Sequence, residues 1–381
     1  MAAQGKQTAL VLTGGGARAA YQVGVLAAIA DILPDKKRNP FPIICGTSAG
    51  AVNAAYLATR TDHFAAGVAD LRRLWRGFHA AHIYRADALG MGRSAAGWLA
   101  SMAGGWLVHK TPRSLLDNSP LRKLLTHHLD FSRIDKAIRE ERLRSISITC
   151  SGYGSGHSVS FFQGRNELEP WQRAQRHSAH VKLNIEHLLA SSAIPFVFPA
   201  VKINREYFGD GSMRQVAPIS PAIHLGADKI LVIGAGRHAT HEAFRPTEAS
   251  SYPTLAQIAG HTLSSIFLDS LWADLERLQR INKTLSLIPE QVRREQGMQL
   301  RPIDVLVIAP SERLDDLAAR HAASLPWPVR AVLGGIGAMN KNGGALTSYL
   351  LFERPYTRAL THLGRKDTLA RRKEVLQFLD C

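Results

Sequence analysis

Residues 46–50, which read GTSAG, limit the possible folds of this chain more than any other segment. They directly follow the apolar run 41–45 and precede a stretch whose composition favours a helix. A serine bracketed by glycines between a strand and a helix is typical of a nucleophile elbow, in which a tight turn carries the hydroxyl away from the sheet and the crowded backbone requires small neighbours. Because GxSxG also arises by chance, the prediction of Ser48 as a nucleophile between Gly46 and Gly50 depends on further motifs.

A second glycine cluster lies near the start of the chain, between an apolar strand pattern at 8–13 and a helical pattern that runs to about residue 33. Its residues are Gly14, Gly15, Gly16, Ala17 and Arg18. Glycines at a helix N-terminus leave backbone N–H groups unpaired, and these can bind a phosphate or stabilise an oxyanion. A dinucleotide site would need an acidic residue after the second strand, which here ends at Cys45 without one. A P-loop lysine is also missing, so the pattern favours an oxyanion hole.

An aspartate between glycines, Asp210, follows the stretch 201–208, which ends in the aromatic pair Tyr207 and Phe208. The same pattern occurs in plain turns. In a chain that already has an elbow serine and a glycine loop, however, a carboxylate at this place is the candidate general base, with Gly211 as its small neighbour.

Taken together, residues 14–18, 46–50 and 210–211 resemble the patatin-like phospholipase family. The resemblance also takes in ASSAIPFVFP at 190–199 and extends over about residues 7–235. That family hydrolyses acyl esters of lipids with a Ser–Asp dyad and no catalytic histidine. The resemblance therefore implies a lipid acyl hydrolase without cofactor or metal.

The site residues that the resemblance implies are Ser48 as nucleophile, Asp210 as general base and the backbone of residues 14–18 as oxyanion hole. Arg18 either steadies the glycine loop or meets a phosphate headgroup. Ser212 and Val216 stand where the family commonly has a second glycine and an asparagine.

Strand and helix patterns alternate along the first 235 residues, which predicts a three-layer α/β/α fold with a mostly parallel central sheet. Further strands are expected at 144–150, 157–162, 229–234 and 303–308, and helices at 62–76, 119–128, 184–192 and 219–226. We expect an acyl hydrolase core at 7–235 and a mainly helical extension at 236–381, whose strand at 303–308 joins the core sheet. The long helical patterns of the extension lie at 253–288, 311–323 and 354–379.

Two other functions fit part of the pattern. A binding protein could hold a phosphate-bearing or lipid ligand at the glycine loop, with a non-catalytic Ser48. An α/β-hydrolase esterase could use a Ser–His–Asp triad, since His224, His238, His241 and His261 follow Asp210. In that fold the elbow comes after several strands, whereas Ser48 follows the second expected strand.

A metal site is not predicted, although the chain has 16 histidines. The pairs His79/His82 and His177/His180 are each three residues apart, and neither has the His-Glu-x-x-His form with a built-in base.

The formal net charge of +16 indicates an anionic partner. Zinc-finger spacing and RNA-binding strand patterns are missing, so we expect peripheral contact with an anionic membrane surface and no nucleic acid. Residues 88–108, which include Trp98 and Trp106, are interpreted as a lid, a loop in the membrane interface or part of the core. Three widely spaced cysteines and the lack of a signal-peptide pattern favour the cytoplasm, with peripheral attachment to the membrane as a further expectation.

Overall fold

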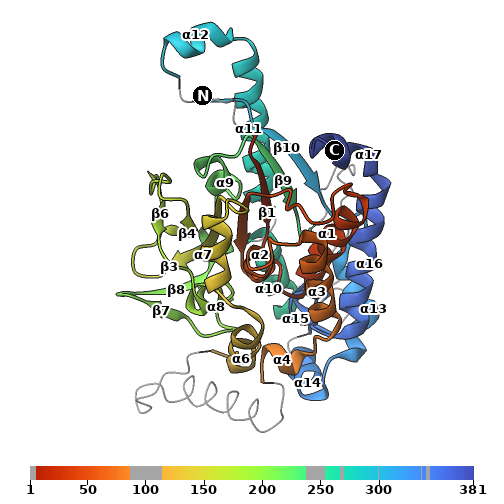
Figure 1. Ribbon diagram of the computed structural model, residues 1–381. Coiled ribbons are helices and arrows are strands. Elements are labelled where there is room, and N and C mark those ends of the chain that lie inside the picture. Colours follow the sequence, from red (N-terminus) through yellow and green to blue (C-terminus); the bar gives the residue numbers. More distant parts are fainter. Residues whose placement is uncertain are drawn as a thin grey trace, which may run out of the picture.

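The structure is a computed structural model (Figure 1), and it describes residues 6–85, 114–236, 254–266, 270–298, 300–335, 337–339 and 344–381. Its strands are β1 (Thr8–Leu12), β2 (Ile43–Thr47), β3 (Ser145–Gly152), β4 (Ser158–Gly164), β5 (Gln172–Arg173), β6 (Arg176–His180), β7 (Val201–Ile203), β8 (Glu206–Asp210), β9 (Lys229–Ile233) and β10 (Asp304–Ile308). They form one ten-stranded sheet. The predicted stretch at 201–208 is thus the hairpin β7–β8.

The helices of the first half are α1 (Ala20–Ile32), α2 (Ala49–Ala58), α3 (Phe64–Arg76), α4 (Ala80–Ile83), α6 (Ser119–His128), α7 (Ser132–Arg139), α8 (Ile185–Ser191) and α9 (Ser220–His224). Those of the second half are α10 (Leu255–Ser264), α11 (Ser270–Ser286), α12 (Glu290–Glu295), α13 (Leu314–His321), α14 (Trp327–Gly335), α15 (Gly344–Leu350), α16 (Arg354–Ala370) and α17 (Arg372–Phe378). Short 3₁₀ turns are η1 (Gly16–Ala19), η2 (Gly211–Arg214) and η4 (Ala322–Ser324).

The centre of the sheet is parallel. Strands β10, β9, β1, β2 and β3 are neighbours in this order, and each pairs in parallel with the next. Beyond them, β4 and β8 both run antiparallel to β3. Because parallel strands end at the same edge of a sheet, residues that follow β1 and β2 meet there.

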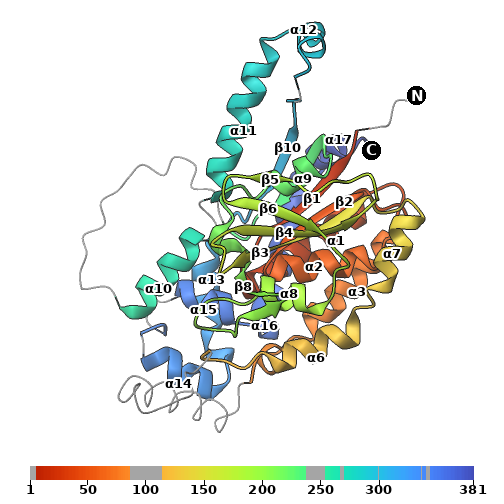
Figure 2. The same cartoon turned by 90° about the vertical axis from the view of Figure 1, so that its left-hand side faces the viewer.

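Alternate residues of the central strands face two separate helical layers, since side chains along a strand point to opposite faces. In β1, Leu10 and Leu12 belong to the large apolar cluster that contains α1, α2, α3 and α16. Ala9 and Val11 belong to a smaller cluster with α9 and α11. Figures 1 and 2 show the sheet between these layers. The predicted three-layer α/β/α fold with a mostly parallel sheet and a helical C-terminal region is confirmed.

The C-terminal half packs directly on the first half. Helix α16 lies along α1 (Figure 1), and glycines allow the close approach. A Cβ atom at Gly24 would lie 2.1 Å from the carbonyl oxygen of Thr361, and one at Gly364 would lie 2.2 Å from that of Tyr21. Strand β10 pairs with β9. The domain boundary near residue 235 stays a prediction.

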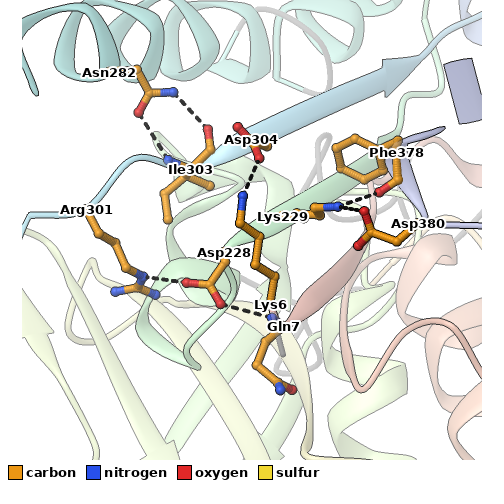
Figure 3. Close-up of polar contacts among 10 residues, drawn as sticks. All are labelled: Lys6, Gln7, Asp228, Lys229, Asn282, Arg301, Ile303, Asp304, Phe378 and Asp380. Carbon is orange, nitrogen blue, oxygen red and sulfur yellow. Dashed lines mark hydrogen bonds and ion pairs between the residues drawn. The ribbon is translucent and has the colours of Figure 1, made fainter. Parts of the chain in front are cut away.

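Polar contacts also fasten the second half at the amino ends of β1, β9 and β10 (Figure 3). The buried Lys229 donates from Nζ to the Phe378 carbonyl at 3.1 Å and to Asp380 Oδ1 at 2.6 Å. Asp228 accepts from the Gln7 amide at 2.9 Å and from Arg301 Nε at 3.2 Å. These contacts stand at the opposite end of the sheet from the turns after β1 and β2.

Residues 88–108 with Trp98 and Trp106, and the histidines His238 and His241, lie outside the described residues. Within the described part of the chain, none of the helices combines the length and the apolar character that a bilayer-spanning segment requires.

Candidate active site

Ser48 occupies the turn between β2 and α2 in a conformation that non-glycine residues rarely adopt. Its φ is 55° and its ψ is −130°, and the residue is 1 % exposed. A Cβ atom at Gly46 would lie 2.6 Å from Ala51 Cα, and one at Gly50 would lie 2.3 Å from the Leu12 carbonyl oxygen. A side chain at either position would therefore collide with the backbone of α2 or of the end of β1, so only glycine fits. Strained backbone of this kind is concentrated at functional sites.

The backbone of Ser48 is held by Ser191, at the end of α8. The Ser48 amide donates to Ser191 Oγ at 2.9 Å, and Ser191 Oγ donates to the Thr149 carbonyl at 2.6 Å. Ser191 thus links the elbow to β3. Sequence reasoning included this serine in the segment 190–199 but gave it no role, because its partners are far away along the chain.

Strand pairing brings Asp210 next to the elbow. Thr47, just before Ser48, pairs with Thr149 on β3, and the following residue of β3, Cys150, pairs with Asp210 on β8. A Cβ atom at Gly211 would lie 2.0 Å from the Thr149 carbonyl oxygen, so only glycine fits there. The sheet therefore places the two predicted dyad residues on adjacent strand ends.

The Asp210 carboxylate is buried, and one of its two oxygens accepts a hydrogen bond from a described residue. It is 1 % exposed, Oδ1 accepts from the Ser212 amide at 2.9 Å, and Oδ2 has no hydrogen-bond partner among the described residues. Burial raises the pKa of Asp210 to about 6, while the hydroxyl of Ser48 and the amide and hydroxyl of Ser212 act to lower it. Ser48 is thus near enough to favour the carboxylate although no hydrogen bond of good geometry is formed, which is common in enzymes without bound substrate.

The position at which the family commonly has an asparagine is Val216, which is exposed. Its neighbour Gln215 makes the local hydrogen bonds. Gln215 Oε1 accepts from Thr47 Oγ1 at 2.9 Å, and Gln215 Nε2 donates to Thr149 Oγ1 at 3.4 Å. The Gln215 side-chain amide thus joins β2 to β3 beside Ser48 and Asp210.

The glycine loop lies beside the elbow with free amides. The first hydrogen bond of η1 runs from the Arg18 amide to the Gly15 carbonyl at 3.1 Å. The amides of Gly15, Gly16 and Ala17 precede it, as at any helix N-terminus, and donate to no described residue. Since Leu12 pairs with Gly46, the loop after β1 and the elbow after β2 are adjacent.

A buried polar network connects the loop to the elbow helix. Gln22 Nε2 donates to the Thr13 carbonyl at 2.7 Å, and Asn53 Nδ2 on α2 donates to Gln22 Oε1 at 2.9 Å and to the Ala19 carbonyl at 3.2 Å. Trp75 Nε1 completes the network by donating to Asn53 Oδ1 at 2.8 Å. Sequence reasoning missed these residues, since a lone glutamine or asparagine in a helix carries no recognisable signal.

The contacts of the Arg18 side chain lie in the C-terminal half. Arg18 is 2 % exposed, and its Nε donates to Ser348 Oγ at 2.7 Å. Its NH2 group forms an ion pair with Asp315. Of the two roles considered for Arg18, these contacts fit the one in which it steadies the loop.

Two of the histidines considered from the sequence, His224 and His79, have other contacts. His224 stacks on Trp171 with ring centroids 4.9 Å apart, and burial and nearby arginines lower its pKa to about 4. His79 contacts Glu353, with Nδ1 to Oε2 at 3.0 Å. Within the described ranges, no three histidine, cysteine or acidic side chains gather as a metal site would require.

A groove of about 1060 Å³ is formed at the other end of the sheet, where it is lined by Thr8 at the start of β1 and by Pro42 and Arg144, which precede β2 and β3. Because Ser48 and the glycine loop follow the carboxyl ends of the strands, this groove is separate from the candidate active site.

Comparison with known proteins identifies the family. The sequence matches the Patatin-like phospholipase family over residues 10–223, more than half of the chain. The chain belongs to the patatin-like phospholipase family. The match includes the glycine loop, Ser48 and Asp210.

A cGAMP-activated phospholipase from Pseudomonas aeruginosa is 25 % identical to this patatin-like protein over 209 residues, which are 55 % of this chain and 53 % of that protein. The chain thus spans about half the length of this curated relative. Human GIVD cytosolic phospholipase A2, in complex with methyl gamma-linolenyl fluorophosphonate, is 13 % identical with a TM-score of 0.44, covering 98 % of this chain and 58 % of that one. VipD from Legionella pneumophila is 14 % identical with a TM-score of 0.33, covering 91 % and 67 %.

Proposed function

We propose that this patatin-like protein is a serine lipid acyl hydrolase, an esterase of the phospholipase A or lysophospholipase type, that works through a Ser48–Asp210 dyad. One observation carries the proposal: the strained, buried Ser48 lies beside a buried carboxylate whose Oδ2 has no hydrogen-bond partner among the described residues. Membership of the family supports an acyl lipid as substrate.

In the first step, Ser48 Oγ attacks the ester carbonyl carbon and Asp210 takes the hydroxyl proton. A carboxyl with a pKa of about 6 is mostly ionised at neutral pH and is a stronger base than an exposed aspartate. The negative charge that develops on the carbonyl oxygen is stabilised by the free amides of Gly15, Gly16 and Ala17. No further side chain is needed for the attack.

The tetrahedral intermediate then expels the alcohol, which receives the proton from Asp210, and the acyl group stays on Ser48 as an ester. A water molecule, deprotonated by the same carboxylate, attacks this ester to give a second tetrahedral intermediate. Its collapse releases the fatty acid, and Asp210 returns the proton to Ser48 Oγ. The sum of the two steps is one ester and one water converted to one acid and one alcohol, with Ser48 and Asp210 restored.

The net charge of +16 supports peripheral contact with an anionic membrane surface, from which a lipid substrate would be taken. A cytoplasmic location with peripheral attachment remains part of the proposal.

A fluorophosphonate probe tests the nucleophile. It should label Ser48 in the wild type and leave Ser48→Ala unlabelled, whereas a binding protein with a non-catalytic serine would not be labelled at all.

Hydrolysis of phospholipids, lysolipids and short p-nitrophenyl esters should fall by about 10³-fold or more in Ser48→Ala and in Asp210→Asn. Asp62→Asn is the matched control, because Asp62 is exposed and pairs with Arg133 on the surface. If folded Asp210→Asn kept most of its hydrolysis, another residue would be the base, and His238 and His241 would be tested next.

A further inference from the structure

The side chain of Arg18 connects the glycine loop to a part of the chain that lies beyond the family match at residues 10–223. Its guanidinium contacts α13 and α15, which lie side by side (Figures 1 and 2). NH2 pairs with Asp315 Oδ1 on α13, and Nε donates to Ser348 Oγ on α15 at 2.7 Å. The guanidinium carbon also lies 4.0 Å from the ring centroid of Tyr349. A buried cation is thus held from several directions.

Helix α15 also touches the backbone of the loop. Gly16 has a φ of 54°, and a Cβ atom there would lie 2.3 Å from the Tyr349 carbonyl oxygen. The position of α15 therefore limits where the Gly16 amide can lie. Because this amide is one of the three free donors of the loop, its position matters for any oxyanion bound there.

The two residues that hold Arg18 are themselves fixed. Ser348 Oγ donates to the Ala345 carbonyl at 2.5 Å while it accepts from Arg18. Asp315 lies in the first turn of α13, and a Cβ atom at Gly344 would lie 2.7 Å from its carbonyl oxygen, so α13 and α15 are in close contact at this point. Helices α13 and α15 thus contact each other, and both contact Arg18 of the glycine loop.

We propose that Asp315 and Ser348 are positioning residues of the active site, which hold Arg18 and through it the oxyanion-binding amides of the glycine loop. This inference rests on the proposed hydrolase function. Removal of Asp315's charge leaves a buried guanidinium without its counter-ion, and the loop that carries it must shift to reach water or another acceptor. A small displacement of preorganised donors is costly for the transition state but not for substrate binding elsewhere.

The test compares Asp315→Asn and Ser348→Ala with Asp316→Asn, which changes the neighbouring carboxylate, whose side chain is 69 % exposed. Turnover of a soluble p-nitrophenyl ester should fall by about 10-fold to 100-fold in the first two variants, with KM nearly unchanged, and should stay at the wild-type value in the control. A trifluoromethyl ketone, which forms an anionic adduct with serine, should lose affinity by the same factor. A purely structural role would not produce this parallel loss.

Two outcomes would overturn the inference. In one, folded Asp315→Asn and Ser348→Ala turn over ester and bind the ketone like the wild type. In the other, kcat falls only in proportion to the fraction of folded protein. If Asp315→Asn does not fold, Ser348→Ala decides, since it removes a neutral hydrogen-bond partner and leaves the ion pair. Failure of the hydrolase function itself is recognised separately, because the wild type would then neither hydrolyse ester nor react with a fluorophosphonate.

Discussion

The ionised carboxylate of Asp210, which the proposed reaction needs as a base, should destabilise the folded protein because it is buried. Its pKa rises from 3.8 in an exposed aspartate to about 6 in the folded chain. One pKa unit corresponds to about 1.4 kcal/mol, so ionised Asp210 opposes folding by about 3 kcal/mol. Asp210→Asn removes this term without removing a hydrogen bond at Oδ2, which has no partner among the described residues. The variant should be inactive and, at neutral pH, more stable than the wild type.

The gain in stability depends on pH in a defined direction. A carboxyl whose pKa is higher in the folded state favours folding at low pH, and this contribution is lost as the pH rises through about 6. The amide does not titrate. Unfolding of a 381-residue chain has an entropy of about 0.8 kcal/mol per kelvin. The difference in melting temperature between Asp210→Asn and the wild type should therefore increase in favour of the variant by about 3 °C from pH 4 to pH 8.

Thermal melts of wild type, Asp210→Asn and Asp62→Asn from pH 4 to pH 8 measure this effect. Asp62→Asn accounts for the loss of one negative charge from a chain of net charge +16, and its difference from the wild type should not widen in the same way. A difference between Asp210→Asn and wild type that is constant over the whole range would refute the reasoning, since Asp210 would then not be a desolvated carboxylate.

Four further results are expected. The kcat/KM for a soluble ester should fall about tenfold per pH unit below about 6, because Asp210 must be ionised to accept the proton, and a flat profile from pH 5 to pH 8 would point to another base. Gly211→Ala should yield little folded protein, since its Cβ would lie 2.0 Å from the Thr149 carbonyl, and a normal yield with normal melting would contradict this. EDTA should leave hydrolysis of a short-chain ester unchanged, because Ser48, Asp210 and backbone amides supply every role, and inhibition reversed by one added cation would overturn the dyad. Liposome sedimentation should show stronger binding to anionic than to neutral vesicles, weakening as the screening length falls from ~10 Å at 0.1 M salt to ~3 Å at 1 M, and equal binding to both would refute the charge argument.

The sequence by itself was enough to predict the strands and turns that carry Ser48, Asp210 and the glycine loop. Gly46, Gly50 and Gly211 stand where a Cβ atom would collide with backbone. A position that accepts only glycine can be recognised in the sequence, because the glycine occurs at a fixed distance from Ser48 or Asp210. The strands at 8–12 and 43–47 are recognisable because strands covered on both faces are nearly all apolar. Local constraints of this kind can be read from neighbouring residues alone.

Tertiary structure decided which polar side chains support the site. Ser191 holds the Ser48 amide, Gln215 joins β2 to β3, and Asp315 and Ser348 hold Arg18 from about 300 residues away along the chain. A single serine, glutamine or aspartate has many possible partners, and its choice depends on how the sheet and the helices pack. The spacing of residues along the sequence does not contain that information, because the contacts form only when strands and helices distant in sequence come together.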